Sequence, residues 1–234
     1  MAGINNALRE RTVPAAAISR RAARFSMVCA VTFVVLLAAL HFVKPELDPS
    51  WHFISEYSIG ANGWMMDLAF VALALSWISL CIAVRPQIHT LSGTIGLILM
   101  LVSAAGLLLA AIFTTDPITT AQEAMTADGK LHNLGGTLGI AMPFAALFIC
   151  WSLARSPAWS SARKSLQWAT GLAWIGFLVS FLSLGVMLSQ SGGKFGANVL
   201  VGWPNRFEIL AYSVWLMVVA RGAAEVTQSN LGST

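Results

Sequence analysis

Charged residues are scarce in this chain. Lys, Arg, Asp and Glu make up 10% of the 234 residues, whereas a typical soluble domain carries about 25%. Hydrophobic residues make up 57%, and the mean hydropathy is +0.73. This shortage of solvating side chains argues against a disordered chain, a coiled coil, collagen or an ordinary cytosolic enzyme. The composition instead predicts a protein that is embedded in a membrane.

Several chemical signatures are also missing. The three cysteines, Cys29, Cys81 and Cys150, lie inside apolar runs, so we expect buried thiols and no disulfide framework. The sequence has no HExxH pair, no GxSxG elbow and no two histidines at matched depth for a haem. It also has no basic-aromatic module for RNA or DNA. We therefore expect no metal, no cofactor and no nucleic-acid partner.

Six long apolar runs are present, and runs of about 20 apolar residues cross a hydrocarbon core as α-helices. We predict an all-α fold: a polytopic integral membrane protein built as a bundle of six transmembrane helices. Pro143 falls inside the fourth run and should kink it. The last run is the shortest, and we expect it to recruit Gly202 and Trp203. The runs cover residues 26–43, 64–84, 91–113, 132–154, 167–189 and 204–220.

The basic residues predict how the bundle is oriented. With the N-terminus inside, the inner segments hold ten of the fourteen Lys and Arg residues, and an excess of positive charge marks the cytoplasmic side. This count favours an N-in, C-in protein. We expect three segments: a basic cytoplasmic segment at 1–25, the transmembrane domain at 26–220 and a polar cytoplasmic tail at 221–234.

Small residues recur four positions apart within the runs and let helices approach closely. We expect them to serve packing within the bundle rather than dimerisation. The pairs are Gly106 with Ala110, Gly135 with Gly139, Gly176 with Ser180, and Gly185 with Ser189.

Polar residues gather at the predicted outer ends of the runs. Ionisable groups at membrane depth are costly unless they are paired, hydrated or facing a cavity. We therefore treat one set as a candidate ligand-binding or structural site, the outer polar cluster. Its members are Ser55 and Glu56 in the first outer loop, Asp67, Asp116 and His132 at the next three helix ends, and Arg206 and Glu208 at the last.

Three interpretations of the outer polar cluster stay open. It could be a hydrogen-bonded lid, for example with Arg206 paired to Asp67 or Asp116. It could bind a lipid headgroup, a small polar ligand or a partner, which is our leading hypothesis. It could also belong to a membrane hydrolase or lipid-modifying enzyme that uses Ser55, Asp116 and His132, or a metal-bound water. The lipid bilayer is the expected surrounding, and the sequence leaves the oligomeric state and any catalytic residue undetermined.

Four short motifs follow one another along the chain: ISEYSIGANGWMMD, IFTTD, GKLHNLGG and PNRFEIL. As a set they resemble the bacterial six-helix membrane family catalogued as domain of unknown function 998. The resemblance covers roughly Val28 to Ala220. It implies a six-helix, multi-pass protein of unassigned biochemistry in a bacterial cytoplasmic (inner) membrane. It also maps Ser55, Asp116, His132 and Arg206 onto the family's characteristic positions.

Overall fold

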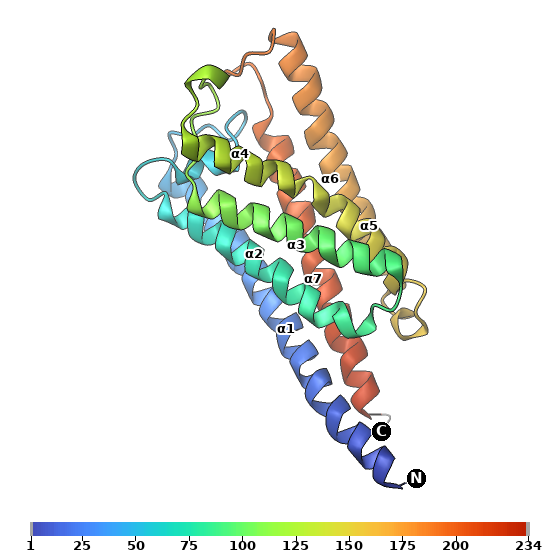
Figure 1. The fold of residues 1–234 in the computed structure, drawn as a ribbon. Helices are drawn as coiled ribbons and strands as arrows, with labels where there is room; N and C mark the ends of the chain where they lie inside the picture. Colours follow the sequence, from blue (N-terminus) through green and yellow to red (C-terminus); the bar gives the residue numbers. More distant parts are fainter. Residues whose placement is uncertain (1, 233–234) are drawn as a thin grey trace.

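The chain folds into a bundle of long helices (Figure 1). The computed structural model describes residues 2–232, with side chains for residues 17–228, and contains no strand within that range. Four short 3-10 helices connect the longer ones: η1 (Ile54–Ser58), η2 (Arg85–Gln87), η3 (Gln122–Ala124) and η4 (Pro157–Trp159). The α-helices are α1 (Ala2–Val43), α2 (Trp64–Val84), α3 (Leu91–Ile112), α4 (Ala127–Gly139), α5 (Ala141–Leu153), α6 (Arg163–Gln190) and α7 (Gly202–Gly232).

Six helical segments are long and apolar enough to cross a membrane. Each of α1, α2, α3, α6 and α7 supplies one, and α4 and α5 together supply the fourth. This confirms the predicted all-α membrane bundle. Figure 1 shows the start of α1 and the end of α7 at the same end of the molecule. We name this end, which also carries η2 and η4, the inner end; the opposite end, which carries η1 and η3, is the outer end.

The central helix of the bundle is α2. It packs against α1 and α3, while α7 packs against α1 and α6. Polar contacts join the apolar surfaces of α1 and α2: Ser26 and Ser76 each donate a hydroxyl to the other's carbonyl oxygen at 2.9 Å. Buried hydroxyls paired in this way leave no orphaned donor in the core. All three cysteines are free and buried, as predicted.

The fourth span is broken, as Pro143 predicts. Helix α4 ends at Gly139, Ile140 forms a turn, and α5 begins at Ala141. Proline has no N–H to bond the carbonyl four residues earlier, and its ring crowds that carbonyl, which belongs here to Gly139. The break lets α4 follow α3 at the outer end while α5 continues toward the inner end (Figure 1).

Three of the four predicted small-residue pairs include a glycine in close contact with a neighbouring helix, and the pair of Gly185 with Ser189 does not. A Cβ on Gly106 would collide with the Gly135 carbonyl, and the reverse also holds, so α3 and α4 touch backbone to backbone. Gly176 packs closely against α7, where an added Cβ would lie 3.0 Å from the Ala211 Cβ and the Glu208 Cα. At Gly139 and Gly185, in contrast, no atom lies within 4 Å of the place that a Cβ would occupy. The outer half of α6 therefore lies away from its neighbours on that side.

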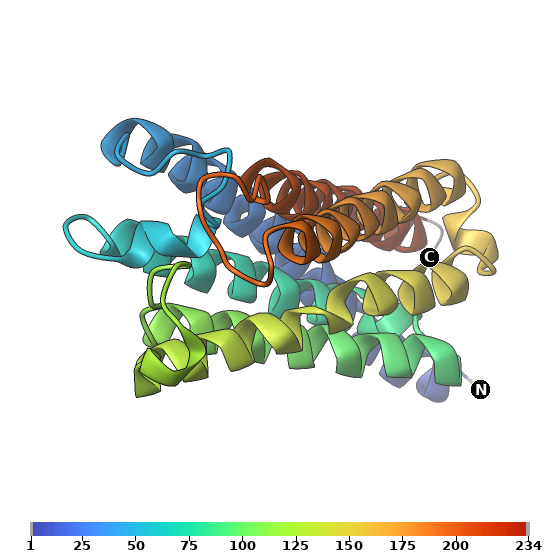
Figure 2. The ribbon, with the colours of Figure 1, turned by 90° about the horizontal axis from the view of Figure 1, so that it is seen from above.

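Helix α6 is the least covered span. Only 11% of its most apolar stretch is buried, compared with 67% for α2. It packs along α7 and meets α5 near the inner end, but α4 and α6 diverge toward the outer end (Figures 1 and 2). After α6, Gly192 and Gly193 adopt φ angles of 67° and 80°, which glycine tolerates, and they turn the chain back toward α7.

Candidate functional site

The most highly bonded side chain at the outer end is Arg206, in the second turn of α7. It is 3% exposed, and its guanidinium lies in a socket formed by α1, the first outer loop and the start of α7. Nε donates to His41 Nε2 at 2.9 Å and Nη2 to the Tyr57 hydroxyl at 3.1 Å. Nη1 donates to the carbonyl oxygens of Pro49 at 3.2 Å, His52 at 2.7 Å and Gly202 at 3.1 Å.

The socket of Arg206 contains only neutral acceptors. His41 donates Nδ1–H to the Leu37 carbonyl at 2.8 Å, which leaves Nε2 free to accept from Arg206. No carboxylate of the described side chains lies within 4.0 Å of the guanidinium. The predicted pairing of Arg206 with Asp67 or Asp116 is therefore wrong. Backbone carbonyl dipoles of the first outer loop stabilise the guanidinium in place of a counter-ion.

The loop that supplies these carbonyls is shaped by local hydrogen bonds. The Asp48 carboxylate accepts the Ser50 backbone N–H at 2.8 Å, and this bond lowers the pKa of Asp48. Lys44 is also buried, at 4% exposed, and donates Nζ–H to the carbonyls of Tyr57, at 3.2 Å, and Ile59. Two buried cations, Arg206 and Lys44, thus hold the first outer loop in place by donating hydrogen bonds to its backbone carbonyls.

Glu56 joins two outer loops. It is 2% exposed. Oε2 accepts from His52 Nδ1 at 2.9 Å and from the Phe53 N–H at 3.1 Å, and Oε1 accepts the Ile118 N–H at 2.9 Å. The last bond crosses from η1 to the segment that follows α3. Ser55, its neighbour in the sequence, is half-buried, and its backbone carbonyl accepts the Ser58 hydroxyl at 2.7 Å.

Asp116 fixes the start of α4. Its carboxylate accepts the Thr126 N–H at 2.8 Å and the Thr126 hydroxyl at 3.0 Å, and Thr126 in turn caps the helix by accepting the Gly129 N–H at 3.0 Å. One turn later, His132 pairs Nδ1 with the Phe113 carbonyl at 2.9 Å and packs edge-on against Phe70. Both side chains hold α4 against the end of α3.

These contacts do not assemble a catalytic triad. Asp116 bonds Thr126, and the Nδ1 of His132 faces a backbone carbonyl rather than a carboxylate. No hydrogen bond of the described part of the chain joins Ser55, Asp116 and His132 to one another. Among the same residues, no group of three or more His, Cys, Asp or Glu side chains is arranged to hold a metal ion.

Asp67 and Glu208 differ from the rest of the outer polar cluster. Asp67 is in the first turn of α2, and its Oδ1 is buried without a hydrogen-bond partner among the residues that the structure describes. Glu208 accepts the Tyr212 hydroxyl at 2.8 Å, and Ser180 of α6 lies beside it. Neither carboxylate has a cation within 4.0 Å among the described side chains. The two carboxyl groups therefore have no ion-pair partner in that part of the protein.

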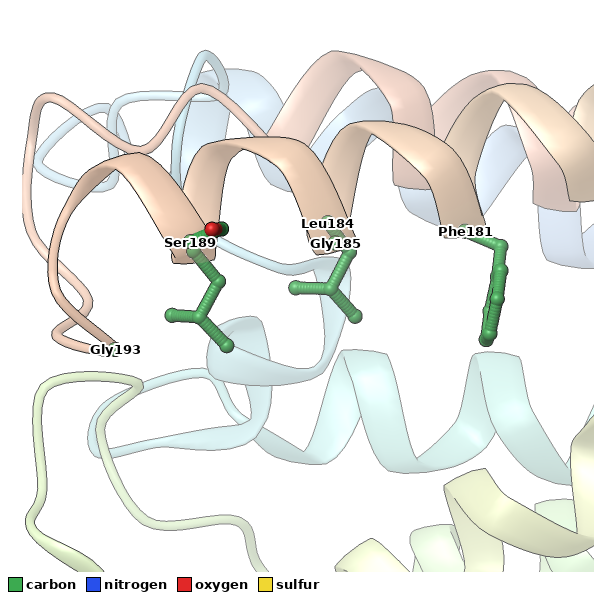
Figure 3. Close-up of a pocket in the computed structure, with 6 residues that line it drawn as sticks. Phe181, Leu184, Gly185, Ser189 and Gly193 are labelled. Carbon is green, nitrogen blue, oxygen red and sulfur yellow. The ribbon is translucent and has the colours of Figure 1, made fainter.

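A pocket of about 370 Å³ opens along the outer half of α6 (Figure 3). Figure 3 shows Phe181 and Leu184 projecting from α6 on the side where the neighbouring helices run. The lining is almost entirely apolar. Gly185 leaves room in the middle of the pocket, because it has no side chain and no atom lies within 4 Å of the position that a Cβ would occupy. Ser180, which lies beside Glu208, precedes Phe181 on the same helix. The residues that line the pocket are Phe181, Leu184, Gly185, Leu188, Ser189 and Gly193.

Four residues that take part in the bonding at the outer end were not among the predicted members of the outer polar cluster. Lys44, His41, Tyr57 and His52 all take part in the bonding described above. Two of them could have been predicted, because His41 and Lys44 lie at the end of the first apolar run. An ionisable side chain at that depth needs hydrogen-bonding partners.

The chain belongs to the family described as "Protein of unknown function (DUF998)", which it matches over residues 27–222. The match covers all six spans except the ends of the first and last. No curated protein and no solved structure matches the chain.

Proposed function

We propose that the protein binds an amphipathic molecule, a membrane lipid with a hydrogen-bond-donating head group, in the pocket along the outer half of α6. The hydrocarbon part would lie on Phe181, Leu184 and Leu188. The head group would be directed to the carboxylates of Asp67 and Glu208. An ammonium or hydroxyl group has the donor that Asp67 Oδ1 lacks.

One observation carries this proposal. The other ionisable members of the outer polar cluster are satisfied by protein groups, whereas Asp67 has a buried oxygen without a partner. A buried unsatisfied carboxylate oxygen costs about 1–3 kcal/mol or more. A donor from a bound molecule would remove that cost, and the pocket on α6 gives a lipid a sideways entry from the bilayer.

The first experiment is native mass spectrometry of the gently extracted protein. Gly185→Leu should fill the pocket without a clash, because no atom lies within 4 Å of its Cβ position. Gly171→Leu is the matched control, since Gly171 is on the same helix, is equally open and does not line the pocket. We expect a reproducible lipid adduct on the wild type and on Gly171→Leu, and its loss from Gly185→Leu.

A second variant tests the head group. Asp67→Asn removes the charge but keeps the size of the side chain, so it should weaken lipid retention while thermal stability stays the same or rises. Asp128→Asn, at an exposed position, is the control. A wild type that is extracted bare, or an adduct that survives Gly185→Leu, would contradict lipid binding and leave the outer end as a structural lid.

A further inference from the structure

A second pocket, of about 320 Å³, lies between α5 and α6 near the inner end. On α5 its lining follows one helix face, with Leu147, Cys150 and Trp151 at spacings of three and four residues. On α6 it uses Arg163 and Gln167, which are one turn apart. Arg155, just beyond the end of α5, completes the rim. The pocket thus has an apolar floor and a basic rim.

Among the described side chains, the two arginines of this pocket have no acidic partner. The ion pairs of the described side chains are His52 with Glu56 and Arg221 with Glu225. Glu225 is the one acidic residue at the inner end whose side chain is described, and Arg221 already holds it at 2.8 Å. The positive charge of Arg155 and Arg163 is therefore available to an anion from outside the protein.

Arg155 is held in place from one face. Its guanidinium carbon lies 4.1 Å from the centre of the Trp151 ring, within the range of a cation–π contact. Such stacking orients the planar group and leaves its N–H donors free at the edge. A guanidinium presented edge-on fits two phosphate oxygens at once, which an ammonium does not do.

The surroundings of the pocket are those of a bilayer boundary. Trp151 and Trp168 are 53% and 63% exposed, and exposed tryptophans are typical of the interface between hydrocarbon and head groups. Deeper along the same two helices, Leu147 and Ile175 are exposed and apolar. A ligand in the pocket thus meets positive charge at head-group depth and apolar side chains where acyl chains run.

We propose that this pocket binds an anionic phospholipid of the inner leaflet. Arg155, Arg163 and Gln167 would hold its phosphate, and Leu147 and Cys150 would contact the start of its acyl chains. Basic pockets between transmembrane helices are suited to such head groups. The site is separate from the pocket along the outer half of α6 and does not depend on the function proposed for that pocket.

The test measures phosphatidylglycerol binding to the full chain in a neutral detergent by native mass spectrometry, with phosphatidylcholine as the zwitterionic comparison. Arg155→Gln with Arg163→Gln removes both charges of the pocket. Arg85→Gln with Lys164→Gln is the matched control, because it removes two exposed charges from the same end that do not line the pocket. We expect the pocket variant to bind phosphatidylglycerol about tenfold more weakly and the control to bind it like the wild type.

Three results would overturn the proposal. Equal loss in both double variants would show diffuse charge attraction, and equal binding of phosphatidylcholine would show an apolar contact alone. Displacement of the lipid by millimolar sodium phosphate would identify a soluble anion as the occupant. If the pocket variant fails to fold, Arg155→Lys with Arg163→Lys keeps the charge but removes the planar forks, and binding should still weaken. Gly185→Leu should leave this binding unchanged, which separates the two pockets.

Discussion

Arg206 shows at the scale of one residue how a membrane protein satisfies a buried cation without a carboxylate. Five hydrogen bonds from its three nitrogens reach α1, the first outer loop and the start of α7. Lysine keeps the charge but cannot span these acceptors, so Arg206→Lys should lower the free energy of unfolding by about 2–4 kcal/mol. Thermal unfolding in detergent measures the effect. Arg85→Lys, at an exposed position, is the control and should unfold like the wild type. An unchanged unfolding temperature for Arg206→Lys would show that the socket does not stabilise the protein.

The contact between Asp116 and Gly129 gives a second prediction, about the effects of substitutions on stability. A Cβ on Gly129 would collide with the Asp116 carboxylate that holds Thr126. We expect Gly129→Ala to destabilise the fold by about 1–3 kcal/mol and Asp116→Ala by about 1 kcal/mol through the loss of the helix-start contact. Because both changes break the same contact, the double variant should cost less than the sum of the two. Additive effects in thermal unfolding would show that the residues act independently.

The partners of these residues could not be predicted, although the residues themselves could. Charge, burial cost and position at a run's end predicted that Arg206, Glu56 and Asp116 lie at the outer end. Their acceptors and donors are mostly backbone groups, such as the His52 carbonyl and the Ile118 N–H. Nearly every residue carries a backbone N–H and a carbonyl group. The sequence therefore does not indicate which of these groups a loop brings into contact with a side chain.

At the scale of the helices, the close approach of α3 and α4 depends on two glycines. Gly135→Ala would place a Cβ against the Gly106 carbonyl, so it should separate the helices and cost about 1–3 kcal/mol. Gly136, the next residue, has no atom within 4 Å of its Cβ position. Gly136→Ala should therefore be neutral, or stabilise α4 by up to about 1 kcal/mol through the lower entropy cost of alanine. Equal unfolding temperatures for the two variants would contradict this packing.

Helix boundaries were less predictable than helix number. The thickness of the hydrocarbon core sets the length of an apolar run, so six runs predicted six spans. The helices continue past those runs: α4 begins at Ala127 rather than at 132, and α6 at Arg163 rather than at 167. Their first turns are polar and are held by local contacts such as the Thr126 cap. A hydropathy pattern identifies apolar runs only. It does not identify these first turns, because they are helical but polar.

At the scale of the whole molecule, the charge bias predicts which end faces the cytoplasm. The exposed positions Asp128, at the outer end, and Ser160, at the inner end, can each be changed to cysteine to test this. The native cysteines are buried and should not react with an impermeant maleimide. The positive-inside rule predicts labelling of Asp128→Cys in intact cells, and of Ser160→Cys only after the membrane is opened. The reverse pattern would place Arg155 and Arg163 outside, and the pocket they line would then face the other leaflet.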